Sequence, residues 1–330
     1  MTKLAAVVTA CVIASACGGS TPPTTKAAVP PARGYHHLFS SGDGVLLFGG
    51  ETAPPRGGGY VLGDVWVYRV GHGWAERKGI GHKDGRLDGY STKDGELLSF
   101  VDWKEKFEPI EETWLYGPQL DIWQQQPSKE RPNIANGSVM AYDAESDRMI
   151  VFTGETWSYN IHTNTWQHMK PAKSPIFGAF GGFVYDERSD RVFYMGGDGR
   201  GNLTDVWNYD FNQDTWTQST AAQGPGARDY PALAYDRRSG RIFLFGGLGA
   251  EMYGDTWAYD ATASTWTELH PSASPSPRAR HAMAFDLATG TIVMFGGSGA
   301  AKLLAPGGKF NNDTWIYDPA QNRWSRAAVQ

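Results

Sequence analysis

Residues 232–266 read ALAYDRRSGRIFLFGGLGAEMYGDTWAYDATASTW, and the fold can be inferred from this stretch. The continuous apolar run at 242–245 is typical of a strand buried on both faces, and the alternation at 255–260 is typical of a second strand. Trp257 and Tyr259 are two residues apart, so they share one side of that strand. Further strands are expected at 232–236 and around Trp266. The stretch therefore predicts a four-stranded antiparallel sheet.

The same spacing recurs six times along the chain. In each copy a tryptophan is followed two residues later by a tyrosine, and a second tryptophan comes nine residues after the first, or eight in the first copy. The first tryptophans are Trp66, Trp114, Trp157, Trp207, Trp257 and Trp315, and the second are Trp74, Trp123, Trp166, Trp216, Trp266 and Trp324. One such sheet cannot bury both of its faces alone, so the copies are expected to stack in a ring. We expect Trp257 to pack in a layer between two sheets.

In four copies the apolar run ends in a glycine doublet, as at Gly246-Gly247. An apolar strand, a Gly-Gly, a spaced aromatic residue and a tryptophan together resemble the kelch repeat, over about residues 33–330. The resemblance implies an all-β protein, a six-bladed β-propeller of four-stranded antiparallel blades. Each blade is expected to come from one contiguous segment. The expected blades are about residues 33–78, 79–127, 128–171, 172–222, 223–271 and 272–330.

The N-terminus has the features of a secretory leader. An apolar run at 4–16 follows Lys3 and is shorter than the roughly 20 residues of a membrane-spanning helix. Residues 14–17, Ala-Ser-Ala-Cys, resemble the lipobox of bacterial lipoproteins, although Ala14 stands where that motif usually has leucine. We expect a signal peptide at 1–16, a lipidated Cys17 and a flexible linker at 17–32, which together make an extracytoplasmic lipoprotein. The alternative is a secreted protein with an unmodified Cys17.

Composition argues against several functions. The chain has 30 Lys and Arg against 35 Asp and Glu, so it lacks the basic surplus that nucleic-acid binding needs. Its two cysteines, Cys11 and Cys17, precede the repeats, which excludes a thiol nucleophile or thiolate metal site in the ring. The histidines show no zinc-like spacing. We therefore predict no catalytic residue, no metal site and no cofactor.

Acidic residues recur in the repeats. One stands two residues before each first tryptophan, and others close the first strands. Recurrence in every copy favours a structural role, and we expect these acids to cap turns. The first set is Asp64, Glu112, Glu155, Asp205, Asp255 and Asp313, and the second is Asp143, Asp186, Asp236 and Asp286.

Basic and aromatic residues recur where one blade leads into the next. If the first strands line the axis, these residues surround one mouth of the central channel. Arginine beside aromatic side chains suits anionic ligands or acidic peptide loops, and the alternative is that the arginines form salt bridges to neighbouring blades. The candidate ligand-binding residues are Arg33, Arg86, Arg228, Arg278, Tyr35, Tyr230 and, from a long loop of the sixth copy, Lys302; Phe180 lies nearby.

These features predict a binding or scaffold protein of the cell envelope. Its ligand would be an unknown protein, an anionic small molecule or a glycan, and it would be a monomer that touches the membrane only through its lipid anchor. The alternative is an enzyme acting on a carbohydrate or a small anionic substrate at the propeller mouth. A deep axial pocket with acids or histidines that break the repeat would favour the enzyme, whereas a flat mouth would favour protein binding.

Overall fold

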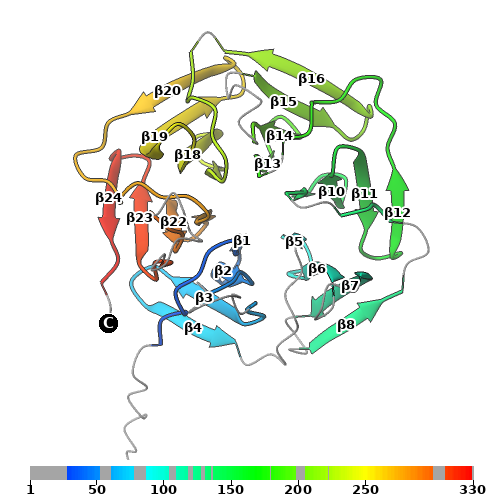
Figure 1. Ribbon diagram of the computed structural model, residues 1–330, viewed down its shortest axis with the longest axis horizontal. Coiled ribbons are helices and arrows are strands. Elements are labelled where there is room, and N and C mark those ends of the chain that lie inside the picture. The colour runs from blue at the N-terminus through cyan, green and yellow to red at the C-terminus, as the bar shows by residue number, and fades with distance from the viewer. Residues whose placement is uncertain are drawn as a thin grey trace, which may run out of the picture.

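The computed structural model describes residues 28–52, 61–77, 87–103, 109–117, 122–127, 131–134, 137–178, 180–197, 205–221, 223–299 and 309–328. These residues form 24 strands in six four-stranded antiparallel sheets, and each sheet uses four consecutive strands of the chain. The predicted six-bladed β-propeller is confirmed (Figure 1).

Each blade contributes its strands in order from the axis to the rim. The first three blades contain β1 (His37–Ser41), β2 (Gly44–Phe48), β3 (Val65–Arg69) and β4 (Gly73–Arg77); β5 (Leu87–Tyr90), β6 (Leu97–Trp103), β7 (Pro109–Gly117) and β8 (Ile122–Gln126); and β9 (Val139–Asp143), β10 (Arg148–Phe152), β11 (Thr156–Asn160) and β12 (Thr165–His168). The last three contain β13 (Gly182–Asp186), β14 (Arg191–Met195), β15 (Asp205–Asp210) and β16 (Thr215–Thr220); β17 (Ala232–Asp236), β18 (Arg241–Leu248), β19 (Met252–Asp260) and β20 (Thr265–Leu269); and β21 (Ala282–Asp286), β22 (Thr291–Phe295), β23 (Thr314–Asp318) and β24 (Arg323–Arg326).

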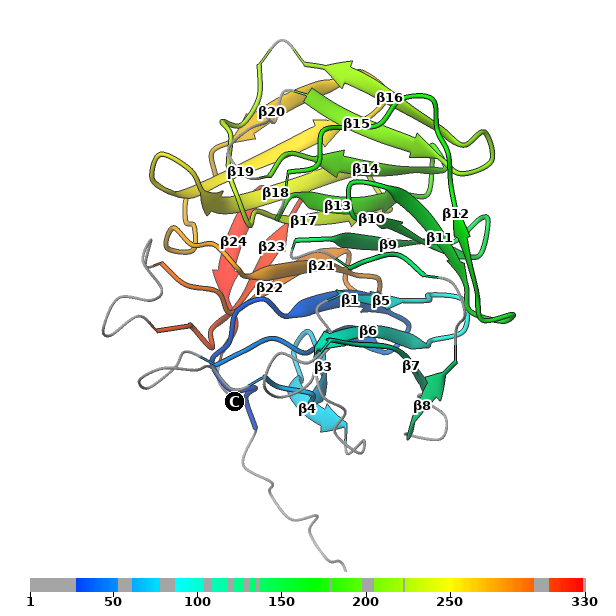
Figure 2. The same ribbon diagram turned by 45° about the vertical axis from the view of Figure 1, so that its right-hand side comes forward.

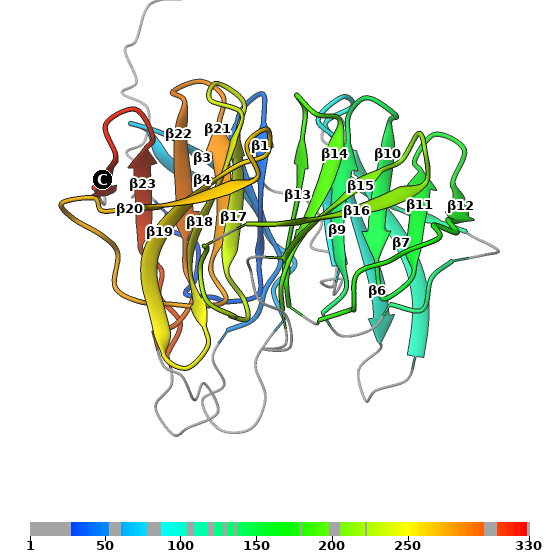
Figure 3. The same ribbon diagram turned by 90° about the horizontal axis from the view of Figure 1, so that it is seen from above.

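The first strands form the inner wall of the ring. Each of β1, β5, β9, β13, β17 and β21 contacts the first strands of both neighbouring blades, and β21 lies beside β1, where the ring closes. The inner strands run along the ring axis, whereas the rim strands β16 and β20 cross it obliquely, as the twist of a sheet requires (Figures 2 and 3). Among the described residues there is no helix long and apolar enough to cross a membrane.

The second tryptophan of each copy holds adjacent blades together. Trp324 packs against Phe245 of the preceding blade with ring centroids 5.1 Å apart, and Trp216 packs against Phe152 at 5.3 Å. Trp257 packs against the apolar layer between the fourth and fifth blades, as expected, but it is only partly buried, whereas Trp266, the second tryptophan of that blade, is buried. The tryptophan of the rim strand is therefore a buried member of the layer between the blades, whereas the first tryptophan packs against that layer.

The glycine doublets lie where two blades approach each other. Gly296 and Gly297 have φ angles of 69° and 78°, a region that glycine tolerates best. A Cβ atom at Gly296 would lie 2.7 Å from the carbonyl oxygen of Arg33 in the next blade. Side chains are therefore excluded here both by backbone conformation and by space.

The recurrent acids are structural, in two different ways. Those that close the first strands cap the following turn, as expected: Asp236 accepts from the backbone N–H of Arg238 and the hydroxyl of Ser239. The acids before the first tryptophans instead accept the indole N–H of that tryptophan, as Asp255 does from Trp257 at 2.7 Å. The same bond joins Asp64 to Trp66, Glu112 to Trp114, Glu155 to Trp157 and Asp313 to Trp315.

Candidate functional site

Three of the predicted ligand-binding arginines are buried inside their own blades. Arg33, Arg228 and Arg278 are at most 2% exposed. Each guanidinium donates to both oxygens of one aspartate of the same blade, at 2.6–2.9 Å; the acceptors are Asp64, Asp255 and Asp313, respectively. The structure thus places these arginines in ion pairs, the alternative raised from the sequence, although within one blade and not between blades. Their guanidinium groups are not open to a ligand.

The ion pairs lower the pKa values of the three paired aspartates. For Asp313, burial acts to raise the pKa, but the hydrogen bonds and positive charge of Arg278 outweigh burial and hold the pKa below its ordinary value. Asp64 and Asp255 show the same balance with Arg33 and Arg228. The three aspartates therefore remain ionised at neutral pH. The three ion pairs connect the segments that lead into β1, β17 and β21 to the third strands of the same blades, β3, β19 and β23.

A second set of repeat-equivalent residues meets at the channel mouth. Tyr35, Phe180, Tyr230 and Arg280 each stand two residues before the first strand of their blade, and each has a positive φ between 54° and 67°. Phe180 stacks on Tyr230 with centroids 4.3 Å apart, and Tyr230 meets Tyr35 edge-on at 5.5 Å. Positive φ is uncommon for bulky residues, and such strained positions are frequent at functional sites. We call these four residues the mouth cluster.

Arg280 supplies the positive charge of the mouth cluster. Its guanidinium carbon lies 4.6 Å from the centroid of the Tyr230 ring, and its Nε donates to the hydroxyl of Tyr35 at 2.6 Å. Within the described part of the chain, Arg280 has no carboxylate partner, and its Nη1 is buried without a hydrogen bond. The cluster therefore carries a positive charge that those residues do not neutralise.

The predicted aromatic residues are thus brought together, but with a different arginine. Tyr35 and Tyr230 lie at the mouth with Phe180 beside them, as expected. Arg280 was missed, although the repeat contains the signal: it stands two residues after Arg278, where the first and fifth copies have Tyr35 and Tyr230. Two other candidates, Arg86 and Lys302, lie outside the described residues.

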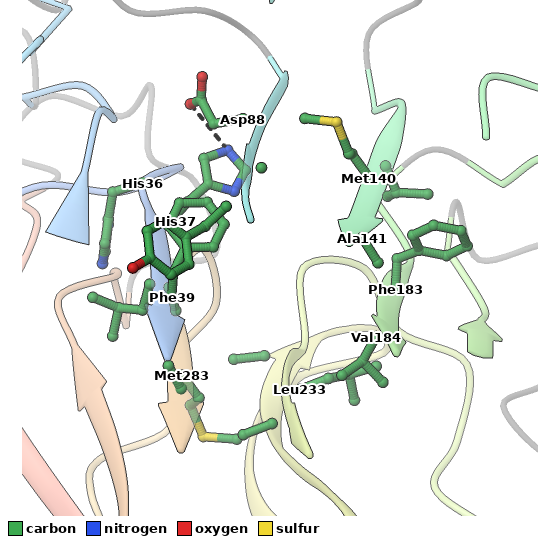
Figure 4. A pocket seen from close by; sticks show the side chains of 18 of the residues that line it. His36, His37, Phe39, Asp88, Met140, Ala141, Phe183, Val184, Leu233 and Met283 are labelled. Carbon is green, nitrogen blue, oxygen red and sulfur yellow. Dashed lines mark ion pairs between the residues drawn. The ribbon is translucent and has the colours of Figure 1, made fainter. Parts of the chain in front are cut away.

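The channel contains a partly open cavity of about 1400 Å³, and the mouth cluster forms part of its lining. Side chains of all six inner strands line it, and most of those drawn in Figure 4 are apolar, among them Met140, Phe183, Leu233 and Met283. Small-molecule sites are typically deep, mostly apolar cavities with a few polar groups. The mouth cluster therefore borders a large, partly open cavity.

One histidine–aspartate pair lies in the wall of this cavity. His37 Nε2 of β1 lies 3.5 Å from Asp88 Oδ2 of β5, across the seam between the first two blades (Figure 4). The Asp88 side chain is fully buried, whereas 34% of the His37 side chain is exposed. Burial raises the pKa of Asp88 well above its ordinary value, and enclosure by the channel walls lowers the pKa of His37 to about 4. Both are perturbed in the direction that favours the neutral form.

Comparison with protein-family models shows what kind of propeller this is. The family described as the KLHDC2/KLHL20/DRC7 Kelch-repeats domain matches residues 102–285 and again residues 155–330. The two matches together cover more than half of the chain. The protein belongs to the kelch-repeat family. No curated protein matches the sequence of this kelch propeller.

Within the described ranges of the kelch propeller, two groups of side chains have the spacing of metal ligands. Asp94, Asp147 and His162 form one, and Asp143, Glu145 and Asp190 form the other, with ligand atoms within 4.8 Å of one another. Asp147 already accepts from Lys93 Nζ at 2.8 Å and from the hydroxyl of Tyr142 at 2.7 Å, and Asp143 caps its own turn. These contacts account for both groups as ties between turns, so we assign no metal to either.

Proposed function

We propose that this kelch propeller is a binding protein that takes the anionic group of a small ligand at its channel mouth. The observation that carries the proposal is Arg280, whose guanidinium lies over Tyr230 without a carboxylate partner among the described residues. An arginine held on aromatic faces keeps its charge and its hydrogen-bond donors in a fixed orientation for a carboxylate, sulfate or phosphate. The cavity beneath favours a small molecule over a protein surface.

The cellular location is part of the same proposal. The leader and Cys17 support an extracytoplasmic protein held at the membrane by a lipid on Cys17. These residues lie outside the described part of the chain, so the proposal rests on their sequence. A binding protein so placed would meet ligands outside the cytoplasm.

Matched pairs of anionic and neutral probes test the binding site. We would measure the melting temperature of the purified protein with 4-hydroxybenzoate and galacturonate, and with their neutral counterparts 4-hydroxybenzyl alcohol and galactose. A ligand that binds the folded state raises the melting temperature. We expect a rise with an anion that exceeds the rise with its neutral counterpart.

Two arginine variants test whether Arg280 is responsible for the preference for the anion. Arg280→Met should remove the preference for the anion. Arg323→Met is the control, because Arg323 is exposed on the rim strand β24, and it should keep the preference. An anion preference that survives in Arg280→Met would contradict the proposal.

A second candidate function is an enzyme acting on a small anionic carbohydrate. It is favoured by His37 and Asp88, which break the repeat, face each other in the wall of the cavity and have perturbed pKa values. Such a pair can transfer a proton. NMR spectra of galacturonate incubated with the protein separate the two functions: a change in anomer exchange or composition indicates an enzyme, and an unchanged spectrum indicates a binding protein.

A further inference from the structure

His37 and Asp88 occupy positions that are apolar in the other blades. The strand pairing fixes the comparison, because His37 lies opposite Phe48, as Leu87, Val139, Ala232 and Ala282 lie opposite the corresponding phenylalanines and Gly182 lies opposite Met195. The position of Asp88 holds Leu38, Met140, Phe183, Leu233 and Met283 in the other five blades. Two residues that break the repeat thus meet at one seam.

The fold does not need this polar pair. At the same position the other blades place apolar side chains, of which Leu38 and Met283 are buried and Leu233 is partly buried. Replacing a buried ion pair by well-packed apolar residues is often neutral or stabilising. A buried carboxylate that could be leucine is therefore better explained by a ligand than by stability.

The pair presents a particular kind of hydrogen-bonding group. It carries no net charge whether its shared proton lies on Asp88 or on His37. With Nε2 of His37 facing Asp88, Nδ1 is left to bond elsewhere. In both cases Nδ1 carries an N–H, because the ring is a neutral imidazole protonated at Nδ1 when the shared proton lies on Asp88, and an imidazolium when it lies on Nε2. The oxygen of a hydroxyl group can accept this N–H in either arrangement.

The surroundings define the rest of the ligand. The His37 ring stacks nearly parallel on Phe39, with centroids 5.9 Å apart and planes 9° apart, and Phe39 stacks on Tyr90. The side chain of Met140 lies on the other side of the cavity from His37, and Met283 comes from β21, the strand beside β1 (Figure 4). Methionine sulfur and flat rings both pack well against an aromatic or other ring-shaped body.

We propose that His37 and Asp88 are the polar anchor of a second subsite in the channel, which binds a hydroxyl group carried by an apolar ring. This second subsite rests on the proposed function only in one respect: the same ligand would place its anionic group at Arg280. The full ligand is then a ring-bearing hydroxy acid. Tyr35, which accepts a hydrogen bond from Arg280, is two residues from His37 in the chain. Arg280 and the His37–Asp88 pair therefore lie on one wall of the channel.

Two uncharged probes that differ in one hydroxyl test the subsite. We would measure dissociation constants of p-cresol and toluene for the full protein by ligand-observed NMR. A hydrogen bond of this kind corresponds to a preference for p-cresol of roughly three- to tenfold. Neither probe carries a charge, so Arg280→Met should leave the preference unchanged. A result that contradicts the anion site at Arg280 can therefore be distinguished from one that contradicts the hydroxyl subsite at His37.

Variants that place the apolar residues of the other blades at these two positions test whether the His37–Asp88 pair causes the preference for p-cresol. Asp88→Leu and His37→Ala introduce the residues found at these positions in the fifth blade. We expect both proteins to fold, Asp88→Leu to unfold at an equal or higher urea concentration than the wild type, and both to bind p-cresol and toluene equally. Asp88→Asn keeps the shape of the side chain but cannot share a proton, and it should also lose most of the preference.

Several results would overturn the proposal. These are equal binding of the two probes to the wild type, no binding of either, or a preference that persists in His37→Ala and Asp88→Asn. Unfolding of Asp88→Leu together with a normal preference in Asp88→Asn would instead show that the pair is structural.

Discussion

The indole N–H of Trp74 in the first blade donates a 2.8 Å hydrogen bond to the hydroxyl of Thr314 in the sixth. Both side chains are buried, and the Trp74 ring also packs against Phe295 at 5.1 Å. The bond crosses the seam where the N-terminal and C-terminal blades meet, and among the described strands none is exchanged between these two blades. The same bond joins Trp216 to Thr156 at an internal seam, also at 2.8 Å.

Thr314→Val should weaken ring closure. It leaves the Trp74 indole N–H buried without an acceptor, at a cost of about 1–3 kcal/mol in the free energy of unfolding. Thr156→Val is the matched control, with a similar global cost. Because the chain does not connect the sixth blade to the first, we expect Thr314→Val also to speed hydrogen exchange in β23 and β24. Unchanged exchange there would show that this bond does not hold the seam.

Arg278→Met should be strongly destabilising. It leaves Asp313, whose side chain is 14% exposed, without its cation, and breaking a buried pair in this way costs about 3–5 kcal/mol. Arg77→Met is the control, because Arg77 pairs with the well-exposed Asp43 and such pairs contribute less than about 1 kcal/mol. Urea denaturation measures both, and equal losses would contradict a special role for the buried pair.

His281 should make the protein less stable in mild acid. Burial, followed by the charge of Arg278, lowers the pKa of His281 to about 3, against 6.5 for an ordinary histidine. Between these values the unfolded chain takes up a proton that the folded chain does not, so the contribution to stability is complete above pH 6.5 and is lost as the pH falls toward 3.

The size of this effect can be measured with a variant. From pH 7 to pH 5 the single histidine accounts for a loss of about 2 kcal/mol. His281→Leu keeps an apolar contact with Phe245 and removes the proton, so its stability should fall by that much less over the same range. Urea denaturation at the two pH values is the measurement, and an identical fall in both proteins would contradict the prediction.

Cys17→Ser should release the protein from the membrane. If Cys17 carries the lipid, the variant moves to the soluble fraction and no longer incorporates labelled palmitate, because a single serine cannot replace the acyl anchor. Cys11→Ser is the control, since Cys11 lies within the expected signal peptide and should be dispensable. A Cys17→Ser protein that stays in the membrane fraction would refute the lipoprotein hypothesis.

Much of the fold followed from the sequence alone, because a propeller repeats one local pattern. The spacing of Trp257, Tyr259 and Trp266, found six times, was sufficient for the number of blades and for their four strands. Strand alternation and glycine doublets are local properties of the chain, so they can be read without coordinates. Cysteine-based chemistry in the ring could also be excluded from the sequence, because both cysteines precede the repeats.

The site depended on tertiary structure, because its members come from different blades. Arg278 and Arg280 are two residues apart and look alike in the sequence, yet Arg278 is buried against Asp313 and Arg280 reaches the rings of Tyr35 and Tyr230. Which arginine is neutralised depends on the direction that each side chain takes from the backbone. His37 and Asp88 likewise became a pair only when the first two blades were placed side by side, since contacts across a seam leave no local signal in the chain.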